Sequence, residues 1–308
     1  MLKYISKRIG MSIFTIFFII TLTFFLMHAV PGNPLQREGK MPASVYKNLE
    51  IKYGLDKPIS QQYLIYIKNV LKFDFGDSMK SKTETVNQMI SRGFPVSARL
   101  GFQALILALI VGPLLGSLAA LYQNKAPDYI AMIFAIIGIS VPSFIMGTLL
   151  IQYIAKGGLL PVSGWGTFKH SILPSIALSL MPTAQIARLM RSSMLEVLGQ
   201  DYMKTAKSKG ISKAAVLIKH GVRNSILPIV SVLGTITADL LMGSFVIEKI
   251  FGIPGLGRFF VNSITNRDYT LIMGTTVFYG MVLVTMILLV DIAYVLIDPR
   301  IKLTGGDN

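Results

Sequence analysis

The sequence of 308 residues contains no cysteine, so disulfide bonds, thiol catalysis and thiolate metal sites are all excluded. Its three histidines, His28, His170 and His220, lie far apart, which argues against a histidine-rich metal site. Charged residues make up only 15% of the chain, whereas a soluble domain carries about 25%. Because 52% of the residues are hydrophobic, this scarcity of charge indicates a protein that lies mostly in a lipid bilayer.

The common enzyme motifs are absent as well. The sequence has no G-x-x-x-x-G-K-[ST] phosphate loop, and neither H-E-x-x-H nor G-x-S-x-G occurs. Residues 252–257 are rich in glycine, but they lack the lysine of a phosphate loop and are better interpreted as an ordered turn. We therefore expect no catalytic residue, no metal site and no cofactor bound by this chain itself.

Six apolar runs are each long enough to cross a hydrocarbon core of about 30 Å. They cover about Ile9–Val30, Leu100–Tyr122, Ile130–Ala155, Ser171–Met190, Ile226–Ile247 and Leu271–Ile297. The first run resembles a signal peptide, but it exceeds the roughly 7–15 apolar residues of one, and a poor cleavage site follows it. We interpret it as an uncleaved span. Proline is tolerated inside spans where neighbouring groups satisfy the freed carbonyl, and the runs contain Pro113, Pro142, Pro174 and Pro182.

The predicted fold is all-α, a polytopic membrane protein with six transmembrane helices and a small helical extracytoplasmic domain between spans one and two. Residues 1–30 form a cytoplasmic N-terminus and the first span. Residues 31–98 form the extracytoplasmic domain, with amphipathic helices near Ser44–Tyr53 and Ser60–Phe73. Residues 99–298 form a five-span core that includes a loop at 191–225, and residues 299–308 form a cytoplasmic tail.

The net charge of +15 does not indicate nucleic-acid binding, because the lysines and arginines lie between the apolar runs. Fourteen of them lie on the side of the two chain ends, and five lie in the two short loops on the opposite side. Residues 31–98 hold ten more, but loops longer than about 60 residues largely escape the positive-inside rule. We therefore expect both termini in the cytoplasm of a cell (plasma) membrane protein.

The loop at 191–225 is the longest one predicted on the cytoplasmic side. Gly210 divides it into two short helical stretches, and apolar residues recur at helical spacing in the second. Lys213, Lys219 and Arg223 lie among them. Such a basic helix either rests on anionic lipid headgroups or docks into a groove on a partner protein. Composition alone leaves these alternatives open.

The segment Asp201–Gly210 reads DYMKTAKSKG. It resembles the cytoplasmic signature of bacterial ABC-importer permeases, known as the EAA loop, in the form D-Y-x-x-T-A-x-x-K-G of the peptide-importer branch. Lys204 stands where the general signature has glutamate, and Leu227-Pro228 resembles its closing Leu-Pro at a longer spacing. Further landmarks of the family match at residues 53–58, 73–76, 160–164, 248–257 and 298–301.

The resemblance is greatest to the first (B) permease subunit of oligopeptide importers. It implies a type I ABC importer permease that moves oligopeptides into the cytoplasm by alternating access. The implied partners are a second homologous permease, two ATPase subunits that bind ATP and Mg²⁺, and an extracytoplasmic peptide-binding protein. It also implies that the loop docks on the ATPase through Asp201, Lys204, Thr205, Ala206, Lys207, Gly210, Ile211 and Ile218. Dipeptide and nickel permeases share much of this pattern.

An aspartate in a span normally faces a bundle interior, a partner or water. Asp239 therefore lines the translocation path or bonds to a neighbouring helix, and the sequence leaves both readings open. Ser140, Ser143 and Gln185 are further candidates for the path. Glu248 and Pro254 flank the fifth span and are candidates for extracytoplasmic docking, although Glu248 also fits a solvated loop.

Two rival functions remain from other classes. An ion-coupled secondary transporter often has inverted repeats and broken helices at mid-membrane, and we find no convincing internal repeat. A membrane-anchored assembly or sensor protein would use residues 31–98 as its outer domain and the 191–225 loop as its output.

Overall fold

The computed structural model describes residues 2–32, 35, 42–81, 83–210 and 212–297. Within these ranges the chain is helical, and the β-structure is one isolated bridge between Asp77 and Thr85. Five helices are long and apolar enough to cross a membrane, and a bent helix pair raises the number to six. The prediction of an all-α polytopic membrane protein is confirmed.

The chain divides into two compact units, and each contains segments that are distant in sequence. Unit 1 combines residues 1–95 with 255–284, and unit 2 combines residues 96–254 with 285–308. Unit 1 contains α1 (Leu2–Ala29), α2 (Ala43–Lys52), α3 (Ile59–Val70), α13 (Leu256–Asn266) and most of α14 (Tyr269–Ile297). The long helix α4 (Val86–Leu121) begins in unit 1 and continues in unit 2.

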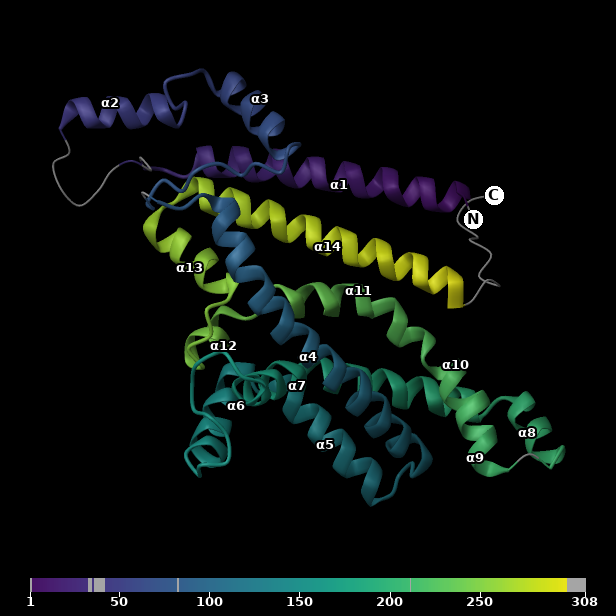
Figure 1. The fold of residues 1–308 in the computed structure, drawn as a ribbon. Helices are drawn as coiled ribbons and strands as arrows, with labels where there is room; N and C mark the ends of the chain where they lie inside the picture. Colours follow the sequence, from purple (N-terminus) through teal and green to yellow (C-terminus); the bar gives the residue numbers. More distant parts are fainter. Residues whose placement is uncertain (1, 33–34, 36–41, 82, 211, 298–308) are drawn as a thin grey trace. The chain divides into compact units, whose positions relative to one another are not determined.

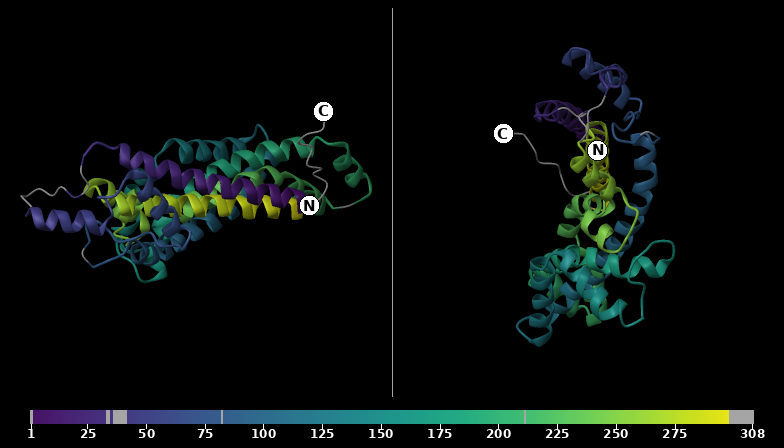
Figure 2. Two further views of the ribbon diagram at one scale, coloured as in Figure 1. Left: turned by 90° about the horizontal axis from the view of Figure 1, so that it is seen from above. Right: turned by 90° about the vertical axis from the view of Figure 1, so that its left-hand side faces the viewer.

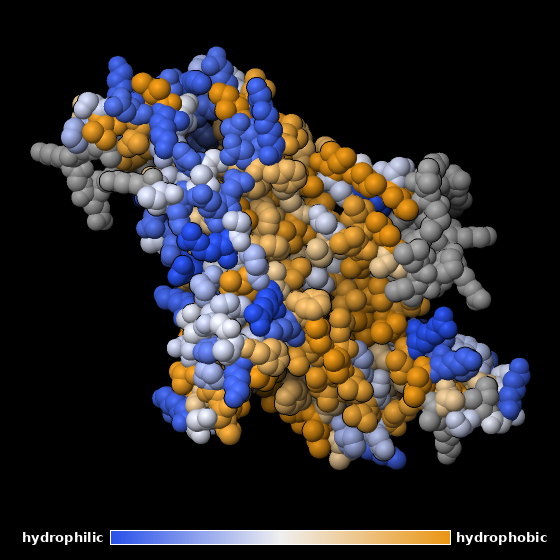
Figure 3. All heavy atoms as spheres, viewed as in Figure 1, coloured by the Kyte–Doolittle hydropathy of each residue, from blue (hydrophilic) through white to orange (hydrophobic). Residues whose placement is uncertain are grey.

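In unit 1, α1 and α14 run side by side in opposite directions (Figures 1 and 2). Gly280 permits this approach, because a Cβ atom there would lie 2.8 Å from the Ile19 side chain. The opposite side of α1 exposes large apolar side chains such as Ile13 and Phe14. Figure 3 shows a broad hydrophobic surface on this face of the molecule. An exposed apolar stripe on a helix of this length indicates contact with lipid.

The predicted helices near Ser44–Tyr53 and Ser60–Phe73 are present as α2 and α3. One side of α3 packs against the last turns of α1. The hydroxyls of Tyr63 and Thr21 lie 2.6 Å apart, and the ring of Tyr66 stacks on Phe24 at a centroid distance of 5.5 Å.

Unit 2 is built around α7 (Phe168–Leu198), the most deeply buried of the candidate spans. It packs against α5 (Ala126–Ser140), α6 (Ser143–Leu150) and α11 (Leu227–Leu241), and the π-helical turn η1 (Ile151–Ala155) continues α6. The core of this unit includes Leu100, Leu173, Ile186, Met190, Met194, Ile229 and Ile247. Close packing of α4 on α7 requires Gly116, where a Cβ atom would lie 2.4 Å from the backbone oxygen of Ala187.

The apolar run Ile130–Ala155 does not form one straight span. It is divided between α5 and the α6–η1 segment, and the two parts meet at an angle of 107°. Val141 has extended backbone angles (φ −90°, ψ 120°), because the ring of Pro142 disfavours helical geometry in the preceding residue. The run Ile226–Ile247 is also interrupted, between α11 and α12 (Phe245–Ile250), where Gly243 adopts φ +73°.

Candidate functional site

The predicted docking loop is a folded segment of unit 2 that projects beyond the end of α7 (Figure 1). It consists of α8 (Asp201–Ser208), α9 (Lys213–Val216), the π-helical turn η2 (Leu217–Val222) and α10 (Arg223–Ser225). The chain then continues directly into α11. The loop therefore connects two helices of the unit 2 core, and a force applied to it would act on both.

The loop has a small apolar core of its own. Met203, Ala206 and Val216 are buried together, and Val197 and Leu198 from the end of α7 pack against them. Ala206 is therefore a packing residue that joins the two arms of the loop. The sequence placed it in the docking surface, but only 8% of it is exposed.

The outer side of α8 carries the polar residues of the signature. Asp201, Lys204 and Thr205 are exposed, and Lys204 Nζ lies 2.9 Å from Asp201 Oδ1. Tyr202 is 43% exposed and its hydroxyl accepts a hydrogen bond from Asn224 Nδ2 at 3.1 Å. This contact ties α8 to α10, so the exposed face is held in one arrangement.

The remaining residues predicted to dock on the ATPase lie at different positions within the loop. Ile218 is 66% exposed on η2, where an apolar side chain is available for a partner. Gly210 has φ +75°, and a Cβ atom there would meet no atom within 4 Å. Glycine at this position is thus required by backbone geometry and not by crowding. Ile211 and the side chain of Lys207 lie outside the described residues.

An ion pair joins Asp128 of α5 to Arg191 of α7, which lies close in sequence to the start of this loop. Arg191 donates from Nε to Asp128 Oδ1 at 2.6 Å and from Nη2 to Asp128 Oδ2 at 2.7 Å. Asp128 Oδ2 also accepts from the backbone N–H of Asn124 at 3.0 Å. Asp128 is 2% exposed, so its charge depends on these donors. The pair fixes the beginning of α5 to the part of α7 that leads into the docking loop.

The sequence did not reveal this pair, because its partners are 63 positions apart. In the sequence, Arg191 is one of fourteen basic residues on the side of the two chain ends and carries no further signal. A usable signal was present in Asp128, which lies in the first turn of an apolar helix directly after Pro127. A carboxylate in that position needs either water or a cation.

One candidate for the translocation path lines a hollow of about 610 Å³ in unit 2. Gln185 lines it from α7, together with Arg188 and Ser192 on the same helix face, Met132 from α5 and Val232 from α11. The other candidates are not among its lining residues. Ser140 is exposed at the end of α5, Ser143 is half-buried at the start of α6, and Asp239 is exposed on α11.

Asp239 lies on a polar face of α11. Ser231, Thr235 and Asp239 follow one another at intervals of four residues, and all three are exposed in this chain. The apolar residues of α11, including Ile229, Ile236 and Leu240, are buried on other sides of the helix. Asp239 therefore does not line the hollow beside Gln185, although the sequence had grouped these two residues together.

The prediction that Glu248 forms an extracytoplasmic docking surface is corrected by its burial. Its side chain is fully buried, and Oε1 accepts a hydrogen bond from Ser97 Oγ at 2.6 Å. The break between α11 and α12 places the carboxylate directly against Gly243, where a Cβ atom would lie 2.3 Å from Oε1. Glu248 therefore packs against the helix break and connects it to Ser97 of α4. Pro254 is half-buried in the segment that follows.

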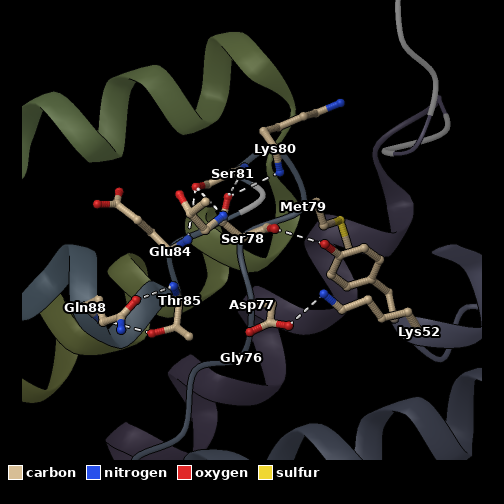
Figure 4. A network of polar contacts seen from close by, with 12 residues as sticks. Lys52, Gly76, Asp77, Ser78, Met79, Lys80, Ser81, Glu84, Thr85 and Gln88 are labelled. Atoms are coloured by element: carbon tan, nitrogen blue, oxygen red, sulfur yellow. Dashed lines mark hydrogen bonds and ion pairs between the residues drawn. The ribbon is translucent and has the colours of Figure 1, made fainter.

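Unit 1 contains a polar network around the landmark at residues 73–76 (Figure 4). Ser78 Oγ donates to the buried carboxylate of Asp268 and accepts from the backbone N–H of Ser81 at 2.8 Å. Asp268 Oδ1 accepts from the N–H groups of Met79 and Leu271 at 3.1 Å each, so it also caps α14. This network anchors the loop before α4 to the start of the last span.

The edge of the same network carries an exposed ion pair. Lys52 Nζ lies 2.9 Å from Asp77 Oδ2, and this hydrogen bond raises the pKa of Lys52. Asp268 belongs to no motif of the sequence. An aspartate immediately before an apolar run is a recognisable helix-start signal, and it would have located this residue.

Comparison with known proteins gives a consistent result over both units. Residues 112–303 match the family described as binding-protein-dependent transport system inner membrane component, and residues 1–100 match the N-terminal region described for such components. The dipeptide transport system permease protein DppB of Bacillus subtilis is 52% identical over 98% of this chain and 99% of its own length. The oligopeptide transport system permease protein OppB of Haemophilus influenzae is 43% identical over 98% of this chain and all of its own length.

Proposed function

Because this chain belongs to the family of binding-protein-dependent transport system inner membrane components, we propose that it is the B-type permease subunit of an ABC importer for peptides. The observation that carries the peptide assignment is the similarity to dipeptide and oligopeptide permeases along nearly the whole chain. The match of Asp201–Gly210 to the peptide-importer form of the docking signature supports it.

We place the docking loop in the cytoplasm, with both termini, and residues 31–98 on the outer side. The excess of basic residues on the side of the termini supports this orientation. Reporters that function only in the cytoplasm or only outside it, fused to each terminus, test the assignment. An active outside reporter at the C-terminus would contradict it.

The complete importer, in this proposal, contains a second homologous permease, two ATPase subunits that bind ATP and Mg²⁺, and an extracytoplasmic peptide-binding protein. This chain contributes the path and the mechanical connection, and the ATPase subunits contribute hydrolysis. The exposed side of α8, with Asp201, Lys204 and Thr205, and the exposed Ile218 form the surface that meets an ATPase subunit.

Transport then proceeds by alternating access between two arrangements of the spans, each favoured by a different ligand. Closure of the ATPase pair on ATP moves the docking loop. The Asp128–Arg191 pair carries that movement from the end of α7 to α5. The hollow beside Gln185 and the polar face of α11 that includes Asp239 offer hydrogen-bonding groups to a peptide without demanding one side chain.

The test is reconstitution of the chain with its permease and ATPase partners in liposomes that contain an ATP supply. Peptide delivered with the binding protein should stimulate ATP hydrolysis and accumulate inside. Liposomes that lack the ATPase subunits are the control. Uptake that persists in them, or that follows an ion gradient, would refute the ABC assignment and favour a secondary transporter.

Cargo length needs a separate measurement, since the relatives include both dipeptide and oligopeptide permeases. Competition between a labelled dipeptide and unlabelled peptides of two to six residues would rank them, with Ni²⁺ as a further competitor. We expect oligopeptides to compete best. Competition by dipeptides alone, or by Ni²⁺ alone, would reassign the cargo and leave the importer assignment intact.

A further inference from the structure

The helix α3 in unit 1 has two apolar sides, and its packing on α1 accounts for only one. Tyr63 and Tyr66 contact Phe24 of α1, and Val70 is buried on the same side. A second row of apolar residues follows the spacing i, i+3, i+7. This α3 stripe consists of Leu64, Ile67 and Leu71, and it continues to Phe73 after the helix ends.

The α3 stripe faces outward from unit 1. Leu64 is 66% exposed, Leu71 is 73% exposed and Phe73 is 67% exposed, whereas Ile67 is half-buried. A row of large apolar side chains with this exposure indicates a surface that is covered by lipid or by another molecule.

The contacts with α1 show at which level of the span α3 lies. The Tyr63 hydroxyl meets Thr21, and Gln62 Oε1 lies 3.0 Å from His28 Nε2 near the end of the span. Thr21 precedes the last residue of α1, Ala29, by about 12 Å along the helix axis. Helix α3 therefore lies beside the final turns of a span and not beyond its end (Figure 1).

The apolar surface of α1 continues onto α3 at this level. Leu22, Phe25 and Leu26 are exposed on the last turns of α1 at 45–56%. The ring of Phe25 lies 5.3 Å from that of Tyr63, so the lipid-facing side of α1 adjoins α3 directly.

The charged and aromatic residues of α3 are also of the types found at a membrane interface. The helix contains no acidic residue, and Lys68 and Lys72 are exposed close to Leu64 and Leu71. Lysine can cover apolar surface with its stem while its ammonium group reaches anionic headgroups. Tyr63 and Tyr66 are the residue type that gathers at membrane interfaces.

We propose that the α3 stripe is embedded in the bilayer, at the boundary between acyl chains and headgroups, and that α3 is a membrane-interface helix. The partner of this surface is therefore lipid. The extracytoplasmic domain expected at residues 31–98 then contacts the membrane through α3, and the proposed transport function does not depend on the outcome.

Fluorescence quenching by brominated lipids tests the proposal. The chain has a single tryptophan, Trp165, so the complex that carries W165F reports only the emission of the partner subunits, which is subtracted from that of each variant. In that background, L71W and L64W place the probe on the stripe, and Q61W places it on an exposed polar position of the same helix. Each variant is purified as the full importer complex and reconstituted in phosphatidylcholine–phosphatidylglycerol vesicles with brominated acyl chains.

We expect L71W and L64W to lose most of their emission in brominated vesicles, and Q61W to lose far less. Equal emission of L71W in brominated and ordinary vesicles would overturn the proposal. So would shielding of L71W from an aqueous quencher only after the peptide-binding protein is added, because that result identifies a protein partner. A variant that retains peptide-stimulated ATP hydrolysis is folded. If L71W does not retain it, the quenching of L64W by brominated lipid tests the proposal instead.

Discussion

The ion pair between Asp128 and Arg191 provides the sharpest test of how the docking loop is connected to the spans. We consider the D128N variant, which keeps the shape of the side chain and removes its charge. The guanidinium of Arg191 then loses two hydrogen bonds to a carboxylate, at 2.6 and 2.7 Å. It also loses its counter-ion at residue 128, which is only 2% exposed to water. Removing one partner of a buried pair destabilises a protein more than removing both.

The magnitude follows from the burial of the two side chains. Loss of one partner of a fully buried pair costs about 3–5 kcal/mol. The Arg191 side chain is 26% exposed, so water can partly solvate the orphaned charge, and we expect the lower end of that range. The double variant with Asp128→Leu and Arg191→Met removes both charges and should recover most of the loss, to within about 1 kcal/mol of the unchanged chain.

Thermal unfolding of the purified complex in detergent measures this effect. We expect Tm to fall by roughly 5–10 °C in D128N and to recover in the double variant. The matched control is D77N, which breaks the exposed Lys52–Asp77 pair and should leave Tm unchanged. An unchanged Tm in D128N, or a double variant as unstable as D128N, would show that the pair does not fasten α5 to α7.

Three further substitutions probe other contacts. Gly210→Val forces a β-branched residue to φ +75°, which costs about 1–3 kcal/mol, and peptide-stimulated ATP hydrolysis should fall while capture of peptide by the binding protein is unchanged. Gly101→Ala places a Cβ atom 1.9 Å from the backbone oxygen of Leu240, and overpacking of this kind costs about 1–3 kcal/mol and should lower Tm. Ser78→Ala leaves the buried Asp268 carboxylate without one donor, which should cost about 1–3 kcal/mol and increase protease cleavage within residues 73–88.

Each of these has a control, either a milder replacement at the same position or the same replacement at an uncrowded position. Gly210→Asn should be milder than the valine variant, because asparagine tolerates left-handed backbone angles. Gly10→Ala should be neutral, since no atom lies within 4 Å of the added Cβ. Ser60→Ala should also be neutral, because Ser60 is exposed. If a control and its test variant behave alike, the contact named for that site is not responsible.

The apolar runs predicted most of the helices, because a span must satisfy its backbone hydrogen bonds internally and stay apolar throughout its length. Their ends were less predictable. Helix α4 begins at Val86, well before the run that starts at Leu100, since polar residues such as Asn87 continue the same helix. Hydropathy detects the lipid-facing part of a helix and not the turns that pack against protein.

The sequence could not predict which prolines interrupt a helix, and the reason is physical. Pro113, Pro174 and Pro182 lie inside continuous helices, whereas the helix ends before Pro142. The local cost of a missing N–H is similar at each position, so the difference depends on packing that is specified elsewhere in the chain. At the break, Gly147 of α6 lies against Phe251, the residue that follows α12, and this contact joins residues far apart in sequence.

In the candidate site, too, features that depend on adjacent residues were predictable and features that depend on tertiary contacts were not. The signature predicted the position of α8 and the turn at Gly210, both of which depend on adjacent residues. It could not distinguish Ala206, which packs inside the loop, from Lys204, which is exposed. The Asp128–Arg191 pair and the burial of Glu248 depend on tertiary contacts, and no local pattern contains them.

The apolar core within the docking loop has an evolutionary consequence. Because Met203, Ala206 and Val216 hold α8 and α9 together, the exposed positions can change without unfolding the loop. In the proposed importer, the residues that recognise an ATPase subunit therefore form a short block of sequence between α7 and α11 that can be exchanged as a unit. We expect residues 200–225 from a related permease, grafted as one block, to redirect the chain to that relative's ATPase, and co-purification with each ATPase would measure the exchange. Grafting α8 alone should fail, since it would mismatch the two halves of the small core.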